Sequence, residues 1–231
     1  MSKLLKIKKI PEYIRQKFYT VCDRVQKWRR ERYMLKVRPY LTNKDFSLIA
    51  NNCNGGVISH DLGIEFRSQF VNLSMNASDY IQYLENFDKY NKLCLEFENS
   101  ESYPIGIIDN IRIDFIHYKS NEEAFEKWEV RKKRINKDNM FFIFTEQGDC
   151  TYEHIKRFDN LDFPNKVVFT CKKYDDIKSA FYVKSFKNNK MGVYMFLAFK
   201  NHFSKHRKYD VFDWVSWFNG EKDLIKLDRQ N

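Results

Sequence analysis

Glycine and proline are scarce in this sequence, with 7 and 4 residues among 231. Charged residues (31%) are intermixed with hydrophobic ones (43%), so disorder is expected only at the ends. No apolar run approaches the length of about 18 residues that would predict a transmembrane helix. The N-terminal residues lack the continuous apolar segment of a secretory signal, and we expect none.

Cysteines are few and scattered, at Cys22, Cys53, Cys94, Cys150 and Cys171. Their odd number and the absence of a C-x-x-C pair argue against a disulfide framework and against a structural zinc site. We therefore expect no metal site and a reducing, cytoplasmic location.

Positive charge gathers at the N-terminal end. Residues 1–38 hold seven Lys and six Arg against three acidic residues, which accounts for the whole formal net charge of +10. Pro11 suits a helix start, and apolar residues then recur every three or four positions, at Ile14, Phe18, Val21, Val25 and Trp28. We divide the chain into a basic amphipathic arm, residues 1–38, and one α/β domain, residues 39–231.

A basic amphipathic helix is typical of an interfacial membrane element. At about 1 kcal/mol for each Lys or Arg near an anionic leaflet, the arm would hold the protein peripherally on the inner face of the cell membrane. The alternative is that the apolar stripe docks on the globular domain. Nucleic acid is not an expected partner, because the rest of the chain has no basic face or known nucleic-acid motif.

The first candidate site is a polar turn after an apolar strand, residues 46–50. Open α/β sheets bind ligands where such turns leave the C-terminal ends of buried strands. We predict Cys53 as a catalytic or acyl-site thiol and His60 as one candidate base. The predicted substrate contacts in the turn are Asn51, Asn52, Asn54, Gly55 and Gly56. The alternative is a structural turn around a small buried cysteine.

The second candidate site follows an alternating strand at residues 111–117. Ser120 and Glu123 have the spacing of a capping box, which predicts a helix start. His117 is the second candidate base. The predicted substrate contacts are Tyr118, Lys119, Trp128, Arg131 and Arg134. The two arginines are included because they lie three residues apart and can bind one phosphate or carboxylate. The alternative is a solvated helix face balanced by glutamates.

Further short apolar runs predict strands at residues 93–97, 103–108, 140–144, 166–170 and 181–183. Helical patterns cover residues 79–87, with Ser78 as N-cap, and residues 152–158 and 211–218, whereas residues 193–199 suit either structure. Strands alternating with helices predict a three-layer α/β fold with a largely parallel sheet flanked by helices, preceded by the basic amphipathic helix.

Several separated segments carry a resemblance to a known family: Asn51–Gly56, Asn72-Leu73, Tyr103–Gly106, His117–Ser120 and Trp128–Asn136. Over about residues 43–220 the sequence resembles a bacterial family of unknown function whose members are labelled exopolysaccharide or capsular polysaccharide biosynthesis proteins. The resemblance implies surface-polysaccharide assembly and no established reaction. Asn52-Cys53 is also similar to the Asn-Cys pair that follows the first strand of some capsule acetyltransferases.

These observations favour a transferase. The leading hypothesis is acyl, O-acetyl, transfer from acetyl-coenzyme A to a lipid- or nucleotide-linked sugar, with a phosphate held by Arg131 and Arg134. The second is a glycosyl- or glycerophosphate-type transferase in which Asp61 or Asp149 holds a metal, although no D-x-D motif is present. The third is a non-catalytic, membrane-associated assembly factor. Catalysis requires that the Cys53 turn and the His117 segment meet at one sheet edge.

Overall fold

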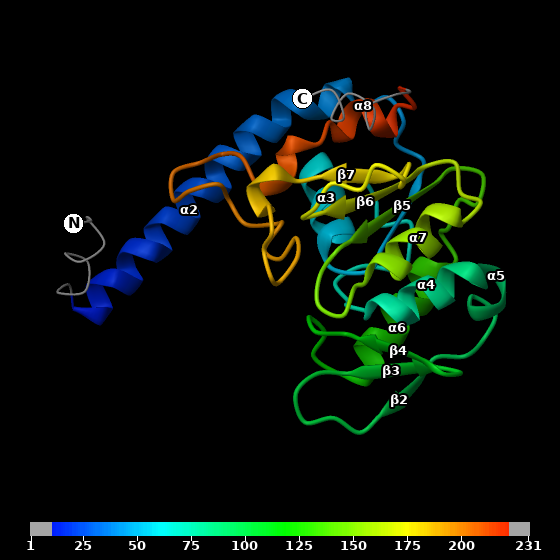
Figure 1. Cartoon of the computed structure of the whole chain (residues 1–231). Helices are drawn as coiled ribbons and strands as arrows, with labels where there is room; N and C mark the ends of the chain where they lie inside the picture. The colour runs from blue at the N-terminus through cyan, green and yellow to red at the C-terminus, as the bar shows by residue number, and fades with distance from the viewer. Residues whose placement is uncertain (1–10, 222–231) are drawn as a thin grey trace.

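The computed structural model describes residues 11–221. At its centre lies a parallel sheet with the strand order β1-β5-β6-β7 (Figure 1). The strands are β1 (Ser47–Ala50), β5 (Met140–Thr145), β6 (Lys166–Thr170) and β7 (Ala180–Tyr182). Ser47 pairs with Met140, and Val168 pairs with Ala180. The strands are apolar along their length because helices cover both faces of the sheet.

Two hydrophobic cores lie on the two faces of the sheet. On one face, α4 (Ala77–Glu85), α6 (Asn121–Lys132) and α7 (Tyr152–Asn160) pack with Phe142 and Phe144. On the other, α3 (Asn54–Leu62), α8 (Trp214–Phe218) and the C-terminal half of α2 (Glu12–Val37) pack with Phe141 and Ile143. Successive residues of β5 alternate between the cores, as strand geometry requires. The predicted three-layer α/β fold is confirmed (Figure 1).

A second, antiparallel sheet was not predicted. It has the order β2-β3-β4, with β2 (Glu96–Glu98), β3 (Ile105–Ile108) and β4 (Ile111–Asp114). Asp109, with φ of 58°, makes the tight turn between β3 and β4. The remaining short elements are α5 (Phe87–Tyr90) and the 3-10 turns η1 (Arg38–Tyr40), η2 (Lys184–Phe186) and η3 (Lys208–Val211).

The predicted N-caps can be compared with the observed starts of α6 and α4. Ser120 caps α6 as predicted, since its hydroxyl accepts from the Glu123 N–H (3.2 Å). Ser78 is not the cap of α4: Asn76 takes that place and accepts from the Asp79 N–H (2.8 Å). Residues 193–199 form turns rather than a strand or helix, and the C-terminal helix is shorter than predicted because residues 208–211 form η3.

The predicted N-terminal helix is confirmed as α2, which starts directly after Pro11. Its docking face is not the apolar stripe but a set of residues four apart: Cys22, Gln26, Arg30 and Met34. The stripe residues remain exposed, from 37% for Val25 to 58% for Trp28, so the alternative in which the stripe docks on the domain is wrong. Within residues 11–221, no helix has the length and apolar character needed to cross a membrane.

Candidate functional site

Three neighbouring parallel strands end in polar or thiol-bearing residues at one edge of the sheet, which we call the carboxyl edge. Asn51 and Asn52 follow β1, Glu146 follows β5, and Cys171 follows β6. Ligands of open α/β sheets bind outside this edge. It is therefore the first place to look for a functional site.

The asparagines of the first turn hold this edge together. Asn51 Oδ1 accepts from the Thr145 N–H (3.2 Å), and Asn54 Nδ2 donates to the Thr145 hydroxyl (2.9 Å). Asn52 Oδ1 accepts from the Asn54 N–H (3.0 Å). All three side chains are buried. Their hydrogen bonds join β1 to β5 and begin α3.

The paired glycines lie in the first turn of α3. A Cβ on Gly55 would lie 3.1 Å from Ala50 Cβ, and one on Gly56 would lie 3.1 Å from Asn72 Oδ1. Close packing therefore accounts for both glycines. The first intrahelical bond runs from the Val57 N–H to the Cys53 carbonyl (3.1 Å), so the N–H groups of both glycines have no acceptor within the helix.

Cys53 is half-buried, directly before α3. Its thiol donates to the Leu73 carbonyl (3.7 Å), and burial raises its pKa, which favours the thiol over the thiolate at neutral pH. His60 lies seven residues further along α3, about 10 Å along the helix axis. Its exposed imidazole is 3.8 Å from Asp61. In this arrangement His60 does not reach the Cys53 thiol directly.

The second predicted segment meets the first through residues 71–73. The Tyr118 hydroxyl donates to the Val71 carbonyl (2.7 Å) and accepts from Arg131 (2.7 Å). Cys53 contacts Leu73, two residues further on. His117, however, follows β4 of the antiparallel sheet. The expectation that it lies at the end of a strand in the parallel sheet is therefore wrong.

The two arginines predicted to bind an anion, Arg131 in α6 and Arg134 just after it, both lie beside residues 65 and 66. Arg131 lies over the Phe66 ring, 5.3 Å from its centroid, besides its bond to Tyr118. Arg134 is exposed and pairs with Glu65 (3.3 Å). Both guanidinium groups thus have partners within the protein.

The other two predicted contacts of this segment have different environments. Lys119 is exposed, and its backbone N–H donates to the Glu123 carboxylate (3.0 Å), which completes the capping of α6. Trp128 is 1% exposed and belongs to the core, where its indole N–H has no hydrogen-bond acceptor among the described residues. Trp128 therefore reaches a ligand only if the core around it opens.

A second part of the carboxyl edge was not predicted from the sequence. A cavity of about 290 Å³, which we call the 146–192 cleft, lies at the ends of β5 and β6. Its lining combines a carboxylate, amides, thiols and lysines: Glu146, Gln147, Gly148, Cys150, Cys171, Lys172, Asn188, Asn189, Lys190 and Gly192. Glu146 follows an apolar strand just as Asn51 does, and this signal could have marked it. Residues 188–192 carry no such local signal.

Glu146 organises the inner wall of the cleft. Its carboxylate accepts from the Cys171 N–H (2.6 Å) and the Tyr174 hydroxyl (3.2 Å). Burial, with Glu146 and Asp149 nearby, raises the pKa of Cys150 to about 12. Burial beside Glu146 raises that of Cys171 to about 11. Both thiols are therefore protonated at neutral pH, and neither is an activated nucleophile.

The carboxylates considered for a metal have other partners. Asp149 accepts from the Ala77 N–H (3.1 Å) at the start of α4. Asp61 pairs with Arg30 (2.9 Å) and Arg207 (3.2 Å). Between residues 11 and 221, no three or more His, Cys, Asp or Glu side chains are grouped so as to hold a metal ion.

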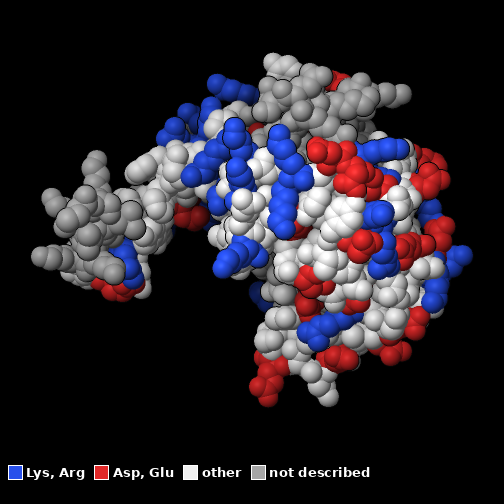
Figure 2. Space-filling model, viewed as in Figure 1, with Lys and Arg blue, Asp and Glu red and all other residues white. Residues whose placement is uncertain are grey.

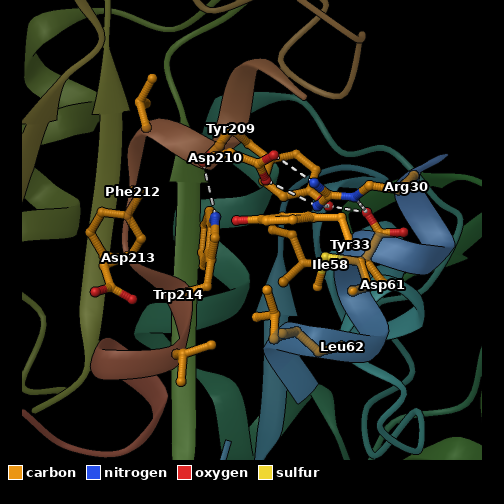
Figure 3. Close-up of a pocket in the computed structure, with 14 residues that line it drawn as sticks. Arg30, Tyr33, Ile58, Asp61, Leu62, Tyr209, Asp210, Phe212, Asp213 and Trp214 are labelled. Atoms are coloured by element: carbon orange, nitrogen blue, oxygen red, sulfur yellow. Dashed lines mark hydrogen bonds and ion pairs between the residues drawn. The ribbon is translucent and has the colours of Figure 1, made fainter. Parts of the chain in front are cut away.

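Another cavity, of about 360 Å³, lies between α2 and residues 209–215 (Figure 3). Beside it, Arg30 donates to Asp61 (2.9 Å), Asp210 (2.5 and 3.0 Å) and the Tyr209 hydroxyl (2.8 Å). Burial acts to lower the pKa of Arg30, but Asp210, Tyr209 and Asp61 together raise it, so Arg30 stays charged. Because these polar groups satisfy one another, we interpret the network as the anchor of α2.

Fold and site together define an α/β protein with a polar carboxyl edge next to an anchored N-terminal helix. The chain belongs to the family described as "Domain of unknown function (DUF1919)", which matches residues 24–219. An "Uncharacterized protein" of Haemophilus influenzae is 40% identical over 196 residues, covering 83% of this chain and 93% of that protein. The family match begins inside α2, so the family region includes the docked half of this helix.

Proposed function

We propose that the protein is a transferase of surface-polysaccharide biosynthesis that binds a sugar or sugar-phosphate group at the carboxyl edge. The observation that carries the proposal is the 146–192 cleft, a cavity at the strand ends lined by one carboxylate, three amides and two lysines. Its volume of about 290 Å³ lies just below the usual range of small-molecule sites, about 300 to 1,000 Å³.

The chemistry of the lining suits this ligand class. A carboxylate and side-chain amides accept from and donate to sugar hydroxyls, and lysine ammonium groups bind phosphate. Lys172 and Lys190 come from two separate segments, after β6 and after η2, that line the same cavity as Glu146. The polysaccharide setting is supported by the resemblance of Asn51–Gly56 and Trp128–Asn136 to the corresponding segments of polysaccharide-biosynthesis proteins.

In its most specific form the proposal is acyl transfer from acetyl-coenzyme A. The raised pKa of Cys53 favours a thiol that lines the acyl site over a thiolate that attacks. A sugar hydroxyl would then attack the thioester carbon directly, the carbon–sulfur bond would break, and the hydroxyl proton would pass through a base to the coenzyme A sulfur. His117 does not end a strand of the parallel sheet, but it is retained as the candidate base because neighbouring Tyr118 is bonded to the same 71–73 segment as Cys53.

Isothermal titration calorimetry of the full chain tests the proposal with glucose 1-phosphate, UDP-N-acetylglucosamine and acetyl-coenzyme A as probes. Saturable binding of a sugar phosphate is expected. The double variant Lys172→Ala/Lys190→Ala should weaken it at least about tenfold, since the loss of even one hydrogen bond to a charged group costs about 1.5–3 kcal/mol. Lys92→Ala, an exposed lysine after α5, is the matched control and should bind like the unmodified protein.

The outcomes separate the alternatives. Sugar-phosphate binding without acetyl-coenzyme A binding would contradict the acyl version and leave the glycosyl- or glycerophosphate-type transferase. Full acetyl transfer by Cys53→Ala would instead contradict the role of Cys53 and retain the acyl version. No saturable binding of any probe would contradict the transferase proposal. The non-catalytic assembly factor would then be favoured.

A further inference from the structure

One side of α2, outside its docking face, carries an unusual combination of groups, and at Phe18 it lies beside His202 of the domain, with ring centroids 6.3 Å apart. Phe18, Val21 and Trp28 are 49%, 57% and 58% exposed. Together with Ile14 and Val25 they form what we call the α2 stripe, which spans about 20 Å along the helix axis. Such a continuous exposed apolar surface marks an interaction site.

Helix geometry places charge around this stripe. With about 100° between successive residues, the stripe lies roughly opposite the docking face of Cys22, Gln26, Arg30 and Met34. By the same geometry Lys17 and Arg24 flank the stripe on one side and Arg29 flanks it on the other. The surface is therefore apolar along its middle and basic along both borders.

A hollow of about 460 Å³ lies at the C-terminal end of the stripe. Its lining contains four cationic side chains and no acidic one: Trp28, Arg29, Arg32, Tyr33, Leu35, Lys36 and Lys205. The Arg32 guanidinium lies over the Trp28 ring, 4.6 Å from its centroid. Lys205 comes from the loop before η3, so the globular domain contributes to this surface as well. Figure 2 shows Lys and Arg side chains gathered where α2 meets the body of the molecule.

We propose that the α2 stripe docks on an anionic lipid bilayer, with its apolar side chains at the level of the headgroups and upper acyl chains. The hollow around Trp28 then receives headgroup phosphates. Charge complementarity selects this occupant, because a basic border on an apolar helix face matches an anionic interface. An indole ring beside cationic side chains is the composition found at membrane interfaces.

Two measurements on the full chain test this docking. The first is co-sedimentation with vesicles of three parts phosphatidylcholine to one part phosphatidylglycerol, with pure phosphatidylcholine vesicles as reference. The second is tryptophan emission, which reports on Trp28 because Trp128, Trp214 and Trp217 are at most 7% exposed. Sedimentation with the anionic vesicles and a blue shift of the emission are expected, and both should weaken as salt rises.

Variants locate the surface. Arg29→Glu/Arg32→Glu should weaken anionic-vesicle binding at least 25-fold, since each Lys or Arg near the surface contributes about fivefold. Trp28→Ala should also weaken it, and it removes the blue shift. Lys92→Glu/Lys156→Glu makes the same charge change at exposed positions outside α2 and should retain binding, apart from the weaker effect of net charge.

The proposal is overturned if neutral and anionic vesicles bind equally, or if the α2 double variant binds as well as its control. It is also overturned if sedimentation velocity shows a dimer that Trp28→Ala dissociates, because the stripe would then pair with a second copy of the chain. Near-ultraviolet circular dichroism checks that each variant keeps its fold, which is expected because the substituted side chains are exposed or lie on the helix surface.

Discussion

Arg30→Ala perturbs the anchor that holds α2 on the domain. Arg30 is 4% exposed and makes charged hydrogen bonds to Asp61 (2.9 Å) and Asp210 (2.5 Å). It also donates to the Tyr209 hydroxyl (2.8 Å) and the Lys205 carbonyl (3.3 Å). Alanine removes the cation and leaves two largely buried carboxylates with fewer partners.

The size of the effect follows from this burial. Removing one partner of a buried ion pair costs about 3–5 kcal/mol. Asp61 keeps Arg207 (3.2 Å), and Asp210 keeps the Arg207 N–H (2.9 Å), so the lower value of about 3 kcal/mol is expected. For a domain of this size, that lowers the Tm by about 6–12 °C.

Urea unfolding of the full chain, followed by circular dichroism, measures the loss. Arg29→Ala removes the same charge one residue away on the exposed side and should change the free energy of unfolding by less than about 0.5 kcal/mol. The triple variant Arg30→Met/Asp61→Asn/Asp210→Asn removes the positive and the negative charges together and should recover much of the stability. If Arg30→Ala is as stable as Arg29→Ala, the network does not anchor α2 and this reasoning is refuted.

Gly148 and Gly192 both have positive φ, but only a Cβ on Gly192 would collide, 2.1 Å from the Glu146 carbonyl oxygen. Gly148→Ala should therefore lower the free energy of unfolding by about 1 kcal/mol, and Gly192→Ala should lower it by at least about twice as much. Urea titrations measure both losses, and equal losses would contradict the close approach of Gly192 to Glu146 in the cleft wall. Iodoacetamide near pH 8 should label exposed Cys94 but not Cys150 or Cys171, and mass spectrometry measures the labelling. Equal labelling of the three residues would contradict the raised pKa of Cys150 and Cys171. Because the unfolded chain releases these thiol protons at lower pH than the folded one, the free energy of unfolding should fall as pH rises from about 9 to about 12. Cys171→Ala should make that fall shallower, and an unchanged slope would contradict the assignment.

Local patterns predicted much of the fold. The strand runs at residues 140–144 and 166–170 are apolar because both faces of the sheet are covered, and they were identified correctly. Ser120 was identified as a cap because its hydroxyl and the Glu123 N–H are only three residues apart. Ser78 was wrongly predicted as the cap of α4, because Asn76, the observed cap two residues earlier, is also a residue type that caps helices.

The docking face of α2 depended on partners far away in the chain. In the alternative to membrane binding, periodicity pointed to the apolar stripe as the docking face. Arg30 is buried instead, because Asp61 and Asp210, 31 and 180 residues away, neutralise it. The hairpin of β3 and β4 was also misassigned, because a strand pattern does not reveal which sheet the strand joins. His117 was expected at the wrong edge for this reason.

The candidate site was predicted in part. The turn at Cys53 was recognised as the end of a buried strand. In the structure two of its asparagines, Asn51 and Asn54, form hydrogen bonds with Thr145. The 146–192 cleft was missed because four of its ten lining residues come from the irregular segment 188–192. The position of that segment depends on contacts such as that of the Val193 N–H with the Glu146 carbonyl (2.6 Å).

A crystal structure of the full chain soaked with glucose 1-phosphate tests the central claim most directly. The claim predicts density for the sugar beside Glu146, with its phosphate within hydrogen-bond distance of Lys172 or Lys190. A well-ordered 146–192 cleft that stays free of ligand, while calorimetry under the same conditions shows saturated binding, would contradict it.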